Sequence, residues 1–82
     1  MWKTGEIKVY DQVYRYEAKV FQQGSKYGIA GGVISILYIT DSNGVDVCHY
    51  DRGEWLIEPT HKRELTALYE VIKIFTNKES EK

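Results

Sequence analysis

The chain has 82 residues, which is enough for one hydrophobic core and therefore for one domain. Hydrophobic residues make up 43% of it and the formal net charge is −1, a balance that excludes a disordered chain and a strongly basic nucleic-acid-binding surface. The single cysteine excludes an internal disulfide framework, and no apolar run approaches the ~18 residues of a membrane span. We expect a soluble, cytoplasmic protein.

Alternation of polar and apolar residues predicts two strands at the start of the chain. In residues 5–10, Ile7 and Val9 share one face, and a tight turn follows at Asp11 and Gln12. Residues 13–21 alternate more regularly, with an apolar face formed by Tyr14, Tyr16, Ala18 and Val20 and a charged face formed by Arg15, Glu17 and Lys19. The charged face of this second strand should meet water.

Residues 22–32 form a glycine-rich loop, and a third strand over residues 33–39 is apolar on both faces. Val33, Leu37 and Ile39 are expected on one face, and Ile34, Ile36 and Tyr38 on the other. The dipeptide Asn43-Gly44 is typical of a type I′ hairpin turn. A fourth strand over residues 45–50 therefore returns antiparallel to the third.

A C-terminal helix is predicted after Pro59, with Thr60 as a candidate cap. Apolar residues recur at helical spacing at Leu65, Leu68, Ile72 and Phe75. The expected fold is α+β: a four-stranded antiparallel meander with one C-terminal helix packed on one face (ββββα). Residues 1–78 would form this single domain, and residues 79–82 a frayed tail.

One helix can cover only one face of the predicted sheet, so the apolar outer residues of the third strand lack an internal partner. Such surfaces commonly join two chains. We therefore expect a homo-oligomer whose interface includes Val33, Ile34, Ile36 and Tyr38.

The glycine-rich loop and the segment 50–55 supply the candidate binding residues. Glycine amides can form an anion-binding nest, so Tyr27, Gly31 and Gly32 are candidates, although the glycines also fit a bulged loop. They precede a strand and not a helix, which excludes a P-loop. In the second segment, Asp51 and Arg52 are flanked by Tyr50 and Trp55, a set suited to phosphate, carboxylate or a nucleobase. An Asp-Arg ion pair that steadies a turn is the alternative.

The sequence gives little support for a catalytic site or a metal site. Cys48 and His49 are adjacent on a strand and point to opposite faces, so they cannot act as nucleophile and base. One cysteine and two histidines do not supply a zinc site, and no cofactor is expected. A small hydrolase that uses the Asp51 and Glu54 carboxylates is kept only as a residual hypothesis.

Two blocks, "GSKYGIAGGVISILYI" and "YDRGEWLIEP", resemble a family of small uncharacterised domains from Gram-positive phages and mobile elements, catalogued as domain of unknown function 7678. The resemblance covers roughly residues 24–59. The family pattern often carries basic residues where this chain has Val33 and Ile36, and Glu54 here separates Gly53 from Trp55. The resemblance implies no chemistry, but it implies a phage setting in which small proteins frequently antagonise bacterial defence.

These features predict a non-enzymatic, homo-oligomeric binding protein of the host cytoplasm. It would sequester a nucleotide-type ligand or occlude a host defence protein. The alternative is a nucleic-acid-binding accessory protein that uses Tyr14, Tyr16 and Tyr38 as stacking platforms, which the near-neutral charge disfavours.

Overall fold

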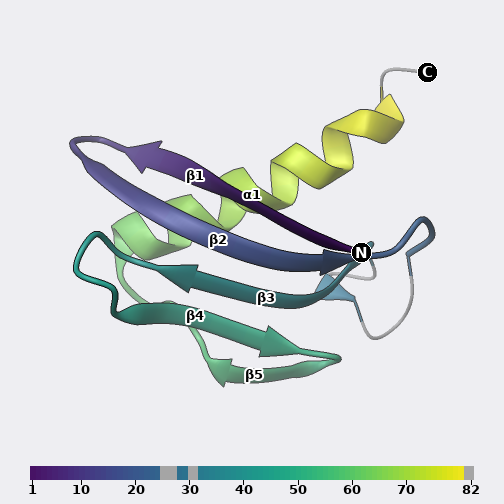
Figure 1. Ribbon diagram of the computed structural model, residues 1–82, viewed down its shortest axis with the longest axis horizontal. Helices are drawn as coiled ribbons and strands as arrows, with labels where there is room; N and C mark the ends of the chain where they lie inside the picture. The colour runs from purple at the N-terminus through teal and green to yellow at the C-terminus, as the bar shows by residue number, and fades with distance from the viewer. Residues whose placement is uncertain (25–27, 30–31, 81–82) are drawn as a thin grey trace.

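The computed structural model describes residues 1–24, 28–29 and 32–80, with side chains up to residue 75 (Figure 1). In this part of the chain the elements are β1 (Trp2–Val9), β2 (Gln12–Val20), β3 (Ile34–Thr40), β4 (Asp46–Asp51), β5 (Glu54–Ile57) and α1 (Lys62–Ser80). The helix includes residues 79–80 of the predicted tail, whereas residues 81–82 lie outside the described residues.

The strands form one antiparallel sheet in the order β1-β2-β3-β4-β5. The predicted α+β class and meander are confirmed, but the predicted number of four strands is wrong. The sequence "DRG" does not end the sheet, because Arg52 and Gly53 have φ angles of 45° and 97° and form a two-residue turn between the paired residues Asp51 and Glu54. Positive φ at both central residues is the signature of a type I′ hairpin, so the chain returns as β5.

The helix α1 lies on one face of the sheet, crosses behind β2 and β1 in the view of Figure 1, and extends beyond the β1 edge. Its inner side buries Ala67, Leu68, Val71 and Phe75. Of the predicted apolar stripe, Leu68 and Phe75 are buried, whereas Leu65 and Ile72 are half-buried at its margin. The sheet contributes Ile7, Val9, Tyr14, Tyr16, Ala18, Leu37, Ile39, Cys48 and Tyr50 to the same core. In the part of the chain that the structure describes, the opposite face of the sheet carries no helix (Figure 1).

A β-bulge in β3 changes which face Ile34 occupies. Lys19 pairs with Ile36 but Val20 pairs with Ile34, so Ser35 is an extra residue in the ladder. Strict alternation would place Ile34 on the same face as Ile36, as predicted from the sequence. The bulge instead turns Ile34 into the core beside Leu37, where it is 4% exposed. The predicted face of Ile34 is therefore wrong.

Two turns differ from their predicted form. The β1–β2 turn is centred on Tyr10, with a φ of 58°, and Asp11, one residue earlier than expected, because Val9 pairs with Gln12. At the β3–β4 turn only Gly44 of the Asn43-Gly44 pair has a positive φ. Asp41 holds this turn, since its carboxylate accepts the amides of Asn43 and Val45 at 2.9 and 3.0 Å. The described part of the chain contains no helix with the length and apolarity needed to cross a membrane.

Candidate functional site

The β4–β5 hairpin contains four of the predicted binding residues, and its turn fixes Arg52. The Arg52 amide donates a hydrogen bond to the Ser35 carbonyl at 2.8 Å, which ties the turn to the bulge of β3. The Arg52 Nε atom lies 2.8 Å from Asp51 Oδ1. The Arg52 side chain is 67% exposed, so this ion pair lies in water and contributes little to stability. The predicted Asp-Arg pair is therefore present at the tip of the hairpin.

Tyr50 and Trp55 face each other across the hairpin but differ in exposure. Their ring centroids are 4.8 Å apart in an edge-to-face arrangement. Tyr50 is 4% exposed and belongs to the core, whereas Trp55 is 38% exposed. Of the predicted aromatic pair, only Trp55 can contact a partner, and the buried Tyr50 ring packs against it.

The strand β5 exposes apolar residues that the sequence analysis did not select. Leu56 and Ile57 are 53% and 39% exposed, and they directly follow Trp55. The register sets Trp55 opposite Tyr50 and Ile57 opposite His49, so Trp55 and Ile57 lie on opposite faces of the sheet. All three residues lie on an edge strand, since β5 is last in the sheet order. Recognising Arg52-Gly53 as a type I′ turn would have revealed this edge strand, because the four residues that follow are then a strand.

The predicted glycine-loop site is described only in part. Tyr27 and Gly31 lie outside the described residues. The Gly32 amide donates to the Ile29 carbonyl at 2.8 Å, so this amide is used within the loop itself. Gly28 packs against the Gly32 carbonyl, and Ile29 reaches the core. The described glycines thus have a structural role in closing the loop.

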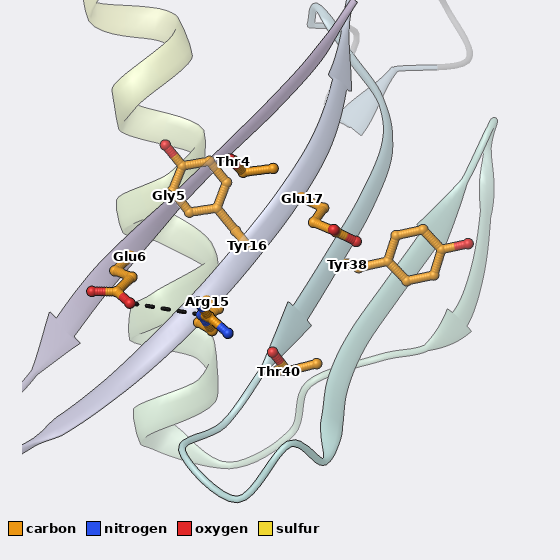
Figure 2. Close-up of a pocket in the computed structure, with 8 residues that line it drawn as sticks. All are labelled: Thr4, Gly5, Glu6, Arg15, Tyr16, Glu17, Tyr38 and Thr40. Carbon is orange, nitrogen blue, oxygen red and sulfur yellow. Dashed lines mark ion pairs between the residues drawn. The ribbon is translucent and has the colours of Figure 1, made fainter.

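The uncovered face of the sheet contains a hollow of about 510 Å³ (Figure 2). It is lined by Thr4, Gly5, Glu6, Arg15, Tyr16, Glu17, Tyr38 and Thr40. Glu17 lies between Thr4 on β1 and Tyr38 on β3, with which it is in register. Figure 2 shows the Glu17 and Tyr38 side chains on the side away from the helix. We call this surface, with its neighbour His49, the open face.

Opposite charges and one aromatic pair shape the open face. The Arg15 Nε atom lies 3.6 Å from Glu6 Oε2 in an exposed ion pair (Figure 2). The Tyr38 and His49 rings stack, with centroids 4.2 Å apart and an angle of 23°. His49 Nε2 is shielded from solvent and has no hydrogen-bond partner among the described residues. The surface therefore offers carboxylates, a guanidinium group and an aromatic ring within one hollow.

The predicted interface residues of the third strand have different surroundings. Ile34 lies in the core, and Val33 is half-buried against it. Ile36 is 9% exposed on the other side, between Lys19 and Asp51 in register, and Tyr38 is half-buried on the open face. The prediction of an interface through these four residues stays a prediction, but Tyr38 and Val33 are the only two of them that retain substantial exposure.

Several polar side chains that could carry chemistry are buried in the core. Cys48 is fully buried, and burial raises the pKa of its thiol to about 12, with a smaller contribution from the Glu64 carboxylate. A neutral thiol is a poor nucleophile. Tyr14 and Tyr16 are also buried beneath the helix, so of the three predicted stacking platforms only the half-buried Tyr38 retains partial exposure. In the described part of the chain, no three His, Cys, Asp or Glu side chains gather as a metal site would require.

Fold and surface together define a small α+β protein with one covered and one open sheet face. The chain belongs to the family described as "Domain of unknown function (DUF7678)", whose model matches residues 1–76. No curated protein and no solved structure matches the chain significantly.

Proposed function

We propose that this protein is a non-enzymatic binding protein of phage or mobile-element origin that acts in the host cytoplasm. It antagonises bacterial defence by covering a surface of a host protein. The proposal rests on one observation: among the described residues, no helix covers this sheet face, which carries an aromatic ring among charges of both signs. Membership of the family of unknown function, and the phage setting implied by the two sequence blocks, support the proposed origin.

A protein partner fits the open face better than a nucleotide. The carboxylates of Glu6 and Glu17 would repel phosphate groups, and the Arg15 guanidinium is already paired with Glu6. Arg52, the predicted phosphate ligand, lies at the hairpin tip and not among the residues that line this hollow. Mixed charge around an aromatic side chain is instead typical of protein interfaces, where it sets orientation and partner choice.

Phage growth in a defended Gram-positive host tests the proposed function. Expression of the protein should raise the plating efficiency of a phage that the host's defence system restricts. The double variant Glu17→Lys with Tyr38→Ala should lose this effect while it keeps the native circular dichroism spectrum, because Glu17 and Tyr38 lie on the open face. The matched control is Tyr69→Ala, which removes a 61% exposed ring from the helix.

Equal protection by the double variant and the wild type would rule out the open face as the active surface. A nucleotide ligand is tested separately by adding nucleotides to purified protein. A rise in melting temperature that depends on nucleotide concentration would favour sequestration over occlusion.

A further inference from the structure

The Tyr38 ring lies along the open face, with one side covered and the other side turned away from the sheet. His49 on the neighbouring strand β4 is in register with Tyr38, and the two rings stack with centroids 4.2 Å apart and an angle of 23°. In Figure 2 the Tyr38 ring lies in front of β4 with its broad side toward the viewer, and the helix lies behind the sheet. Since His49 covers the inner side of the ring, the outer side is available for a partner.

The Glu17 carboxylate lies beside this ring and forms no ion pair within the part of the chain that the structure describes. Glu17 on β2 is in register with the tyrosine, and Figure 2 shows its carboxylate extending toward the aromatic ring. The two cations that flank it along β2 are engaged elsewhere. The Arg15 Nε atom lies 3.6 Å from Glu6 Oε2, and the Lys19 Nζ atom lies 5.7 Å from the centre of the Phe21 ring. Glu17 is therefore an exposed, unpaired carboxylate next to an aromatic surface.

The charge of the hollow favours a cation. Two carboxylates, from Glu6 and Glu17, and one guanidinium group, from Arg15, line it. Because Glu6 and Arg15 neutralise each other, the unbalanced charge is that of Glu17. A cation over an aromatic ring is attracted by the negative face of the ring, and the neighbouring carboxylate adds a second attraction. The hollow thus suits a cationic group that contacts the ring and the carboxylate together.

We propose that the host protein covered by the open face presents an arginine to Glu17 and Tyr38, an inference that rests on the proposed function. The guanidinium group lies flat on the outer side of the Tyr38 ring and donates two hydrogen bonds to the Glu17 carboxylate. A guanidinium group suits this position because it is planar, stacks on aromatic rings and directs its donors within its own plane, toward a carboxylate beside the ring. A lysine ammonium is more strongly hydrated and has no plane to stack.

Blocked tripeptides test this recognition without the host protein. Acetyl-Gly-Arg-Gly-amide, added to the isotope-labelled full chain, should shift the NMR signals of Glu17 and Tyr38 with a dissociation constant of roughly 1–30 mM, as a contact with one side chain allows. The δ-methylene protons of the peptide arginine should move upfield, because they lie over the Tyr38 ring. The same peptide with citrulline, which has a similar shape but no charge, should bind at least about tenfold more weakly. A lysine peptide should bind at least about threefold more weakly.

Two variants assign the binding to the proposed residues. Glu17→Gln removes the charge with little change of shape and should weaken binding of the arginine peptide by about fivefold or more. Tyr38→Leu removes the aromatic ring and should weaken it by about threefold or more. The matched control is Glu58→Gln, which neutralises an exposed carboxylate that does not line the hollow and should leave binding unchanged. Circular dichroism verifies the fold of each variant.

Three outcomes would overturn the proposal. The first is a citrulline peptide that binds the wild-type chain as tightly as the arginine peptide, and the second is a Glu17→Gln variant that binds like the wild type. The third is a lysine peptide that binds as tightly as the arginine peptide, which would overturn the choice of arginine.

The phage assay separates this inference from the proposed function. If the chain binds the arginine peptide as expected but the double variant Glu17→Lys with Tyr38→Ala still protects the phage, the arginine site is supported and the proposed function fails. If the double variant loses protection, Glu17→Gln keeps it in full and no peptide binds, the open face acts on its partner without an arginine and this inference is overturned.

Discussion

The ring of Tyr16 lies over Gly5, its partner in the β1–β2 register, and leaves no room there for a side chain. A Cβ atom on Gly5 would lie 2.6 Å from the Tyr16 hydroxyl oxygen and 2.7 Å from two ring carbons. The ring cannot easily move, because it is buried and makes an edge-to-face contact with Phe75 at 6.0 Å. Gly5 is therefore required by packing, and it sits within β1 and not at its start.

Replacement of Gly5 by alanine should lower the free energy of unfolding by about 1–3 kcal/mol, the usual range for overpacking a filled site. Urea denaturation followed by circular dichroism measures this change. In a Tyr16→Ala background the same replacement should cost much less, because the obstructing ring is gone. An equal cost in both backgrounds would show that the strain lies in the backbone and not in the ring contact.

Two further glycines should respond differently to alanine. At Gly28 a Cβ atom would collide with the carbonyl oxygen of Gly32, a backbone atom that cannot rotate away. At Gly44 the φ is +81°, but among the described residues no atom beyond its two chain neighbours lies within 4 Å of the added carbon. Gly44→Ala should therefore cost only about 1 kcal/mol of backbone strain. Gly28→Ala should cost several times more, of the order of 3 kcal/mol or above. Thermal unfolding of the two variants side by side provides the comparison, and a Gly44 variant less stable than the Gly28 variant would contradict it.

The Cys48 thiol should be unreactive in the native protein. Burial raises its pKa from the ordinary value of 9.0 to about 12, and the side chain is fully buried, so a thiol reagent at pH 8 must wait for the chain to open. Labelling in native buffer should be at least about 100-fold slower than in denaturant. Labelling at similar rates in both conditions would mean that the core beneath α1 opens readily.

The same thiol should affect stability at high pH. Because its pKa is higher in the folded state than in the unfolded state, the folded chain holds its proton more tightly. The contribution of Cys48 is complete below pH 9 and is lost progressively as the pH rises from 9 to about 12. The variant Cys48→Ala should lose this part of the pH dependence in urea denaturation curves between pH 8 and 11. An unchanged slope would assign the alkaline loss to other groups.

The sequence predicted the meander and the helix well because both depend on regular patterns. Alternation from Tyr14 to Ala18 matches the buried residues of β2, and the helical spacing finds the buried side of α1 at Leu68 and Phe75. What could not be predicted depends on single irregular residues. The bulge at Ser35 interrupts the alternation of side chains between the two faces of β3, but the residue types in the strand do not reveal it. Arg52 adopts a positive φ that is uncommon for a residue with a Cβ atom, so the turn and the strand after it went unrecognised.

The candidate site was predicted unevenly for the same reason. Arg52, Asp51 and Trp55 were selected because their side chains suggest recognition chemistry, and all three lie on the hairpin. Leu56 and Ile57 carry no such chemistry, and their exposure follows only from the position of β5 at the edge. The open-face hollow joins residues from three strands, so its composition required knowledge of the register.

The strained φ of Arg52 predicts that a residue better suited to a type I′ turn will stabilise the chain. Asparagine tolerates φ angles near 45° more readily than arginine, so Arg52→Asn should raise the free energy of unfolding by about 0.5–1 kcal/mol. The lost ion pair with Asp51 should subtract little, because the arginine side chain is 67% exposed. Urea denaturation at protein concentrations low enough to keep the chain monomeric isolates this effect from association.

The matched control is Arg15→Asn, which removes a similarly exposed ion pair with Glu6 from a regular strand and should give no gain. A loss of stability at Arg52 greater than at Arg15 would mean that the arginine side chain itself holds the hairpin, and that its contacts contribute more than its backbone strain costs.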